Sequence, residues 1–464
     1  MLYCAHGPVP AAGRLLKEGI DMSKFTGKSY RNQVMYSVFV RNHTPEGTFE
    51  GVRRDLERIR ALGTDIVWLL PIHPTGEKCR KGALGSPYAI RDYRAVNPEY
   101  GTLDDFKRLV DEIHRLGMKC VIDVVYNHTS PDSVLAREHP EWFFHRPDGS
   151  FGNRVGDWWD VIDLDYAQPG LWDYQIDTLK YWASMVDGFR CDVAPLVPLE
   201  FWLRARREVE AVRPGCFWLA ESVEPAFVRG GRAGGLPVLS DSELYQAFDV
   251  CYDYDIFGVF QDYVDEKRLL KEYAQAVNNQ EIIYPENYVK LRFLENHDRA
   301  RAAAIFPNRK VRLNWTAFLF FQKGMTLLYA GQEASCTRQP SLFDRDTVDW
   351  SAGEDISALL KNLAALKKHP LLADSWYQVT ALPLDTLLAV HRKGNRQLVG
   401  IFDLYNPSRT AMMDNHFRIE AVSVPVEAPD GLYPNLAFPG ETVEVLRGTV
   451  GVSSRPIIFE APVG

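Results

Sequence analysis

Cysteine is scarce in this 464-residue chain, which contains seven cysteines. The number is odd and the cysteines are widely spaced, which is not typical of a disulfide framework. We therefore expect reduced thiols.

Long apolar runs and an excess of basic residues are also missing. The richest apolar run, Phe318 to Phe321, leads directly into Gln322 and Lys323, far short of the roughly 18 residues of a membrane-spanning helix. Residues 1–8 lack the basic and then apolar layout of a secretory signal. With 61 acidic against 53 basic residues, the net charge is −8, which argues against nucleic acid as the main partner. We expect a cytoplasmic protein that binds neither nucleic acid nor membrane; nothing in the sequence indicates its oligomeric state.

What the chain does carry is a regular alternation of apolar strands and amphipathic helices. The patterns at 34–40, 65–71 and 120–125 predict strands, and the helical pattern over 104–116 stops at Gly117. Continuous apolar strands between amphipathic helices indicate a parallel sheet covered on both sides. The alternation continues with strands at 186–192, 217–220, 247–252, 290–294 and 325–329, and helices at 168–184, 200–212, 260–276, 308–322 and 355–368. Eight strand–helix pairs predict an α/β protein, a (β/α)8 TIM barrel with long loops.

Two regions depart from this alternation. Residues 129–165, rich in Trp, Asp and Gly, interrupt the barrel after its third strand, where a loop of that length is usually functional. Short alternating strands between Pro, Gly and Asn turns predict a C-terminal antiparallel β domain. We thus expect a barrel formed by 1–128 and 166–371, an inserted loop domain at 129–165 and a β domain at 372–464. The glycine-rich stretch 230–235 lacks the context of a phosphate-binding loop and is predicted to be a flexible linker.

One heptapeptide, 188–194, combines an arginine and an acid at the end of a predicted strand. Arg190 and Asp192 lie two residues apart, so on a strand their side chains share a face. An arginine beside a carboxylate favours the charged form and lowers its pKa, which suits a carboxylate nucleophile. On this heptapeptide alone, a purely structural ion pair between Arg190 and Asp192 is as good an interpretation as a catalytic one.

Further acids follow other predicted strands: Asp123, Glu221 and the acids of 295–298. The active sites of such barrels lie at the C-terminal ends of the strands. Retaining glycoside hydrolysis uses one carboxylate as the nucleophile and a second, kept protonated, as the acid. Adjacent strands lie ~4.8 Å apart, which allows the ~5–5.5 Å between carboxyls that a retaining enzyme needs.

Four segments together resemble the α-amylase family of glycoside hydrolases, family thirteen. They are 123–128, 188–192, 219–221 and 295–298, and they occur in the family's order on the expected strands. The resemblance covers about 30–464. It implies a retaining enzyme that cleaves α-glucosidic, mainly α-1,4, bonds of maltooligosaccharides or starch-type glucans.

The resemblance also implies roles for individual residues. Asp192 would be the nucleophile, Glu221 the general acid/base, and Asp298 the acid that stabilises the transition state. The substrate-binding set would be Arg190, which positions Asp192; Asp123, which steadies Arg190; His128 and His297, which hold sugar hydroxyls; and Tyr88, which stacks on the apolar face of a sugar.

The chain departs from the family pattern near the nucleophile. Pro195 and Leu196 stand where α-amylases often have Lys-His and neopullulanase-like members have Asn-Glu, and Ala89 replaces an acid that many relatives carry. We therefore expect weak binding of the sugars on the leaving-group side of the cleaved bond. Two alternatives stay open: a transglycosylase or phosphorolytic enzyme with the same covalent intermediate, and a non-catalytic carbohydrate-binding homologue.

We expect the chemistry to require no cofactor. The resemblance implies that Asn127 could ligate a structural calcium ion with acids such as Asp157, although the sequence does not provide a full set of the oxygen ligands calcium requires. Trp158 and Trp159 fit sugar platforms and packed loop aromatics equally well.

Overall fold

Eight parallel strands close into a barrel in this computed structural model, which describes residues 26–156, 158–406 and 423–464. The strand order around the barrel is β1-β10-β9-β8-β7-β6-β3-β2. The strands are β1 (Val34–Val38), β2 (Ile66–Leu69), β3 (Lys119–Val124), β6 (Gly188–Cys191), β7 (Phe217–Ala220), β8 (Val250–Tyr252), β9 (Lys290–Arg292) and β10 (Met325–Tyr329). Apart from Lys119, every residue in them is buried, because helices cover the outer face and side chains fill the interior. The predicted (β/α)8 barrel is confirmed.

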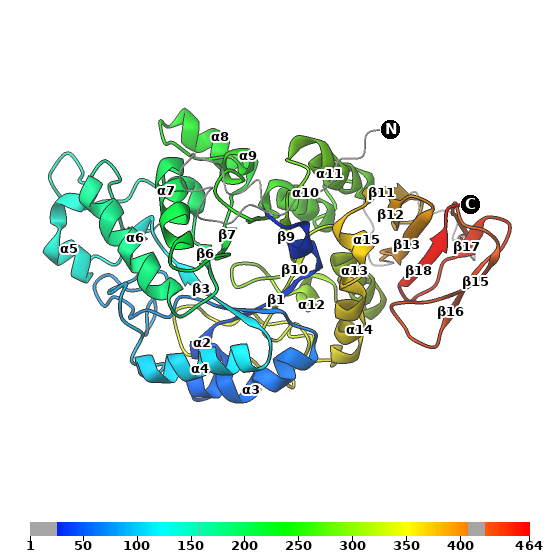
Figure 1. Cartoon of the computed structure of the whole chain (residues 1–464), viewed down its shortest axis with the longest axis horizontal. Coiled ribbons are helices and arrows are strands. Elements are labelled where there is room, and N and C mark those ends of the chain that lie inside the picture. Colours follow the sequence, from blue (N-terminus) through cyan, green and yellow to red (C-terminus); the bar gives the residue numbers. More distant parts are fainter. Residues whose placement is uncertain (1–25, 157, 407–422) are drawn as a thin grey trace.

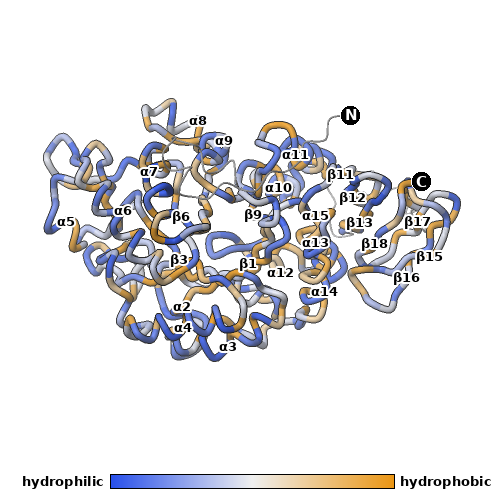
Figure 2. The backbone as a smooth tube through the Cα atoms, viewed as in Figure 1, coloured by the Kyte–Doolittle hydropathy of each residue, from blue (hydrophilic) through white to orange (hydrophobic). Residues whose placement is uncertain are grey.

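Helices surround the barrel (Figure 1). They are α2 (Val40–His43), α3 (Phe49–Ala61), α4 (Leu103–Arg115), α6 (Pro169–Ala183), α7 (Leu199–Glu210), α8 (Pro225–Ala233), α9 (Asp241–Leu244), α10 (Tyr254–Val264), α11 (Leu270–Ile283), α12 (Ala302–Ile305), α13 (Arg309–Phe321), α14 (Ser357–Lys367) and α15 (Pro370–Ala373). Figure 2 shows hydrophilic and hydrophobic residues alternating along the outer helices α3 and α4. In the described ranges, no helix is both long and apolar enough to cross a membrane.

Helix α4 shows how local sequence sets these elements. The Thr102 hydroxyl accepts a hydrogen bond from the Asp105 amide (3.2 Å), and the Asp105 carboxylate accepts one from the Thr102 amide (2.8 Å). This capping box satisfies two amides that the first turn would leave unpaired. Gly117, with φ 73°, ends the helix in the left-handed conformation that glycine adopts without steric cost.

The inserted segment carries little regular structure. Strand β4 (His128–Thr129) pairs antiparallel with β5 (Ile162–Asp163), so the segment leaves the barrel and returns to it at one place. Helix α5 (Val134–Glu138) lies within it.

The C-terminal strands form a separate β domain beside the barrel (orange to red in Figure 1). Its main antiparallel sheet has the order β11-β12-β13-β18, and the described residues of the domain also form two short antiparallel pairs, β14-β17 and β15-β16. The strands are β11 (Trp376–Leu382), β12 (Thr386–Lys393), β13 (Arg396–Asp403), β14 (Ser423–Pro425), β15 (Gly431–Pro434), β16 (Thr442–Val445), β17 (Thr449–Gly451) and β18 (Ile457–Pro462). Helices α11 and α13 of the barrel pack against β11 and β13.

Two element predictions are wrong. The single helix expected at 260–276 is two helices, α10 and α11, with Glu266 between them at φ 60°. Most of the glycine-rich stretch 230–235 is not a linker but the end of helix α8. Arg232 holds this end in place by donating to the Val238 carbonyl (2.8 Å) and to Glu243 (2.5 Å). The six cysteines among the described residues are free thiols.

Candidate active site

The register of the barrel places Arg190 in its interior beside Asp123. These two residues are register partners in the parallel pair β3–β6, so both side chains point to the barrel axis. Gly188 begins β6 because a Cβ there would lie 2.4 Å from the Phe217 carbonyl oxygen of β7. The glycine thus permits the close strand contact that positions Arg190.

Three carboxylates surround the Arg190 guanidinium. Its Nη1 lies 2.8 Å from Asp123 Oδ1 and 2.8 Å from Asp192 Oδ1, and its Nη2 lies 2.9 Å from Glu221 Oε1. Arg190 and Asp123 are fully buried, and Asp192 and Glu221 are 6% and 8% exposed. One planar, rigid guanidinium therefore fixes the relative positions of Asp192 and Glu221.

Arg190 acts on the pKa of Asp192 in the predicted direction, by lowering it, but the net shift is upward and not downward as expected. Burial raises the pKa of Asp192 to about 6, outweighing the opposing effect of Arg190, and the Asp123 charge adds to the rise. Burial likewise raises the pKa of Glu221 to about 7 against Arg190, with Asp192 and Asp298 contributing. Burial raises the pKa of Asp123 to about 6. One cation cannot offset three buried acids, so Glu221 holds a proton near neutral pH, as a general acid must.

Tyr88, His297 and Asp298 form a second group that adjoins the first. The Tyr88 hydroxyl lies 2.7 Å from His297 Nε2 and 3.2 Å from Asp123 Oδ2. The Tyr88 and His297 rings stack with their centroids 5.5 Å apart. His297 Nε2 is also 2.9 Å from Asp298 Oδ2. Asp298, 41% exposed, lies at the mouth of the site. Partial burial opposes the change, but the adjacent His297 lowers the pKa of Asp298, which favours a carboxylate.

His128 closes the other side of the cluster. Its Nε2 lies 3.9 Å from Asp192 Oδ2, and burial lowers its pKa to about 4, so the imidazole is neutral and can accept or donate a hydrogen bond. The Trp158 ring packs near it at 5.4 Å, whereas Trp159 is 59% exposed. Contacts thus join all eight residues predicted for catalysis and substrate binding into one cluster.

Asn127 is buried beside this cluster, with its side-chain nitrogen 3.1 Å from His128 Nδ1. Within the described ranges, no group of three or more His, Cys, Asp or Glu side chains is arranged to hold a metal ion. Asp157 lies outside the described residues. The calcium site remains a prediction.

Sequence reasoning missed three residues of the site. The Tyr252 hydroxyl accepts from Arg190 Nε (3.3 Å), and the Trp68 ring lies 5.3 Å from the Arg190 guanidinium. The amide of Val193 donates to Glu221 Oε2 (2.8 Å). Both aromatics belong to short apolar strands, β2 and β8, and were indistinguishable from core residues. A backbone donor leaves no trace in the sequence.

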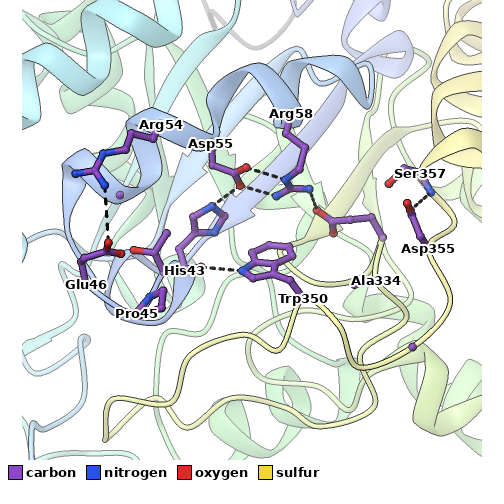
Figure 3. A pocket seen from close by; sticks show the side chains of 14 residues that line it. His43, Pro45, Glu46, Arg54, Asp55, Arg58, Ala334, Trp350, Asp355 and Ser357 are labelled. Carbon is purple, nitrogen blue, oxygen red and sulfur yellow. Dashed lines mark hydrogen bonds and ion pairs between the residues drawn. The ribbon is translucent and has the colours of Figure 1, made fainter.

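A separate pocket of about 540 Å³ lies between α3 and the segment that follows β10 (Figure 3). Its polar side chains are paired with each other: Asp55 contacts His43 Nε2 at 2.8 Å, and Arg58 donates to Asp55 (2.7 Å) and to Glu333 (2.5 Å). None of the predicted site residues lines it. We therefore assign the candidate active site to the carboxylate cluster and not to this pocket.

Comparison with known proteins agrees with this geometry. The family described as "Alpha amylase, catalytic domain" matches residues 26–212, and "Bacterial Alpha amylase C-terminal domain" matches 378–459. A solved α-amylase from Lactobacillus plantarum is 48% identical with a TM-score of 0.87, covering 93% of this chain and 99% of that one. A maltogenic α-amylase from Thermotoga neapolitana is 33% identical with a TM-score of 0.80, covering 94% and 99%.

Curated relatives include a transferase. Alpha-1,4-glucan:maltose-1-phosphate maltosyltransferase 1 of Streptomyces coelicolor is 34% identical over 239 residues, which are 46% of this chain and 34% of that protein. The match therefore spans about a third of that relative's length. With its barrel, its β domain and the ordered carboxylates around Arg190, this chain is an enzyme of the α-amylase family, glycoside hydrolase family thirteen.

Proposed function

We propose that the enzyme is a retaining glycoside hydrolase that cleaves α-glucosidic, mainly α-1,4, bonds of maltooligosaccharides or starch-type glucans. One observation carries this proposal: Asp192 and Glu221 are held by adjacent nitrogens of the same guanidinium. Carboxyls bridged by one guanidinium fit the ~5–5.5 Å separation of a retaining enzyme better than the wider separation of an inverting one.

The proposed reaction has two steps. Asp192 attacks the anomeric carbon while protonated Glu221 gives its proton to the leaving oxygen, forming a covalent glycosyl-enzyme. Glu221, now a carboxylate, then removes a proton from the water that attacks the anomeric carbon and releases Asp192. Asp298, whose pKa is lowered by His297, supplies negative charge near the oxocarbenium-like transition state.

The stereochemistry of the first product tests this proposal. Nuclear magnetic resonance of maltotetraose hydrolysis should show the α anomer before mutarotation. A β anomer would contradict the double displacement. A product time course on maltooligosaccharides, pullulan and sucrose defines the bond that is cleaved.

A second function has a specific observation in its favour, the 34% identity to a maltosyltransferase over 239 residues. In that case the glycosyl group on Asp192 would pass to a sugar acceptor or to phosphate instead of water. Product analysis with and without a maltooligosaccharide acceptor, and with maltose 1-phosphate as donor, separates the two. Elongated products at acceptor concentrations where glucose and maltose do not accumulate would favour the transferase.

A further inference from the structure

The peptide that directly follows Asp192 has an unusual backbone conformation. Val193 has φ 36° and ψ 45°, in the left-handed region. A Cβ disfavours this region in any L-residue, and a β-branched side chain is a genuine outlier there. Among the described non-glycine residues with positive φ, Val193 is the one with a β-branched side chain.

The left-handed turn directs the Val193 amide at Glu221. The preceding amide, that of Asp192, continues the strand pattern by donating to the Val124 carbonyl (2.9 Å). The Val193 amide leaves this pattern and donates to Glu221 Oε2 (2.8 Å). The other oxygen of Glu221, Oε1, is 2.9 Å from Arg190. Both oxygens of Glu221 thus have a partner: Oε1 pairs with Arg190, which also contacts Asp192, and Oε2 accepts from the peptide that follows Asp192.

We propose that Val193 is a positioning residue whose strained peptide sets Glu221 in place for proton transfer relative to Asp192. This inference rests on the proposed role of Glu221 as the acid/base. Strained backbone at a functional site persists only where the surrounding structure enforces it. Here the strained conformation allows a specific hydrogen bond, from the amide of Val193 to the carboxylate of Glu221.

The hydrogen bond also bears on the protonation of Glu221. An amide that donates to a carboxylate favours the charged form, and the Val193 amide opposes the rise in the pKa of Glu221. Losing this donor should therefore raise that pKa further. A role for Val193 in folding alone would not change the pKa of Glu221.

Replacing Val193 in the full chain by the α-hydroxy acid analogue of valine turns the amide between Asp192 and Val193 into an ester. The ester lacks the N–H donor, and its carbonyl is a weaker acceptor, an effect that the control ester shares. We expect kcat/KM for maltotetraose to fall up to about tenfold, as for the loss of one hydrogen bond that positions the neutral acid. The alkaline limb of its pH profile should move to higher pH. A maltoside with a nitrophenyl leaving group, which needs no proton, should lose less than about twofold in the glycosylation step. The matched control is an ester at Val197, whose amide donates to the Ala194 carbonyl (3.2 Å).

An unmoved alkaline limb, or equal losses with both substrates, would overturn the proposal. The conformation is tested separately by melting temperature: glycine at 193 should give a more stable protein than alanine, because glycine adopts positive φ freely. A more stable alanine variant would refute the strain. The acid/base role is tested by itself, since an active Glu221→Gln enzyme on maltotetraose would refute that role whatever the ester shows.

Discussion

At the scale of single residues, the Arg190 guanidinium determines the charge of the site. It is fully buried and contacts three carboxylates, so the cluster carries more negative than positive charge when all are ionised. Water cannot offset this excess because the groups are buried. The acids therefore retain protons to unusually high pH, and the site can contain an acid and a nucleophile at the same time.

Asp192→Asn should abolish catalysis without unfolding the protein. The amide retains the shape of the carboxylate but cannot attack carbon, so we expect kcat on maltotetraose to fall roughly 10³-fold or more. The melting temperature should stay within a few degrees of the wild type. Asp177→Asn, at a side chain 67% exposed on α6, is the matched control and should be fully active. A near-normal Asp192→Asn enzyme would remove the residue from the mechanism.

Glu221→Gln should behave differently because it removes a proton donor. We expect a large loss on maltotetraose but partial recovery of the first step with a nitrophenyl maltoside, whose leaving group needs no proton. Pre-steady-state release of nitrophenol measures that step. Equal losses on the two substrates would be inconsistent with an acid role.

The pH profile of kcat/KM should be bell-shaped and narrow. Activity needs ionised Asp192, whose pKa is raised to about 6, so kcat/KM rises as pH increases through that value. It also needs protonated Glu221, whose pKa is raised to about 7, so kcat/KM falls as pH increases further. The limbs belong to the coupled cluster and not to one residue. A flat profile between pH 5 and 9, roughly, would contradict both assignments.

These residues also show where sequence reasoning stops. The i, i+2 spacing correctly placed Arg190 and Asp192 together, because strand periodicity is local. The sign of the pKa change at Asp192 was wrong, because it depends on burial and on Asp123, which comes from another strand. The backbone of Val193 was equally invisible, since a valine gives no sign of a left-handed conformation.

At the scale of elements, the end of helix α13 depends on two basic side chains from other elements. Lys367 of α14 is fully buried and donates to the carbonyls of Phe320 (2.9 Å) and Gln322 (2.7 Å). His391 Nε2 of β12 lies 2.9 Å from the Phe321 carbonyl oxygen. The cap thus joins the barrel to the β domain, and burial lowers the pKa of Lys367.

Lys367→Met should destabilise this junction. Methionine fills similar space but leaves two buried carbonyls without a donor, each costing about 1–3 kcal/mol. We expect a loss of about 2–4 kcal/mol in the free energy of unfolding, measured by urea titration. The exposed Lys361→Met on the same helix is the control and should change stability little. A neutral Lys367→Met would show that the carbonyls find other partners.

The sequence predicted most barrel elements because each repeats a local pattern, apolar strands and amphipathic helices. The division of 254–283 into α10 and α11 could not be predicted from the sequence. Glu266 at the break is a good helix former, and neither Gly nor Pro marks the break. Helix α8 was missed for the opposite reason. Its glycines disfavour a helix, but Arg232 contacts with Val238 and Glu243 stabilise it from outside the segment.

At the scale of the whole molecule, substrate length depends on what walls the cleft beyond the cleaved bond. Pro195 and Leu196 lie in a single 3-10 turn after the nucleophile, and the Pro195 carbonyl accepts from the Leu239 amide (3.0 Å). The turn therefore offers substrate little to bind: Pro195 has no N–H, its carbonyl already accepts a hydrogen bond, and the Leu196 side chain is apolar.

We expect short maltooligosaccharides to be cleaved at least as well, per mole, as starch. Each missing hydrogen bond to a sugar on the leaving side is worth ~0.5–1.5 kcal/mol, so long chains gain little from binding there. The inserted segment begins near His128, whose Nε2 lies 3.9 Å from Asp192 Oδ2, so we expect it to limit the space for substrate on that side. The measurement is kcat/KM for a maltooligosaccharide series. A steep rise in kcat/KM up to chains of about six or seven glucose units would require several strong subsites. Other loops would then bind the sugars on the leaving side, and the enzyme would cleave within long chains.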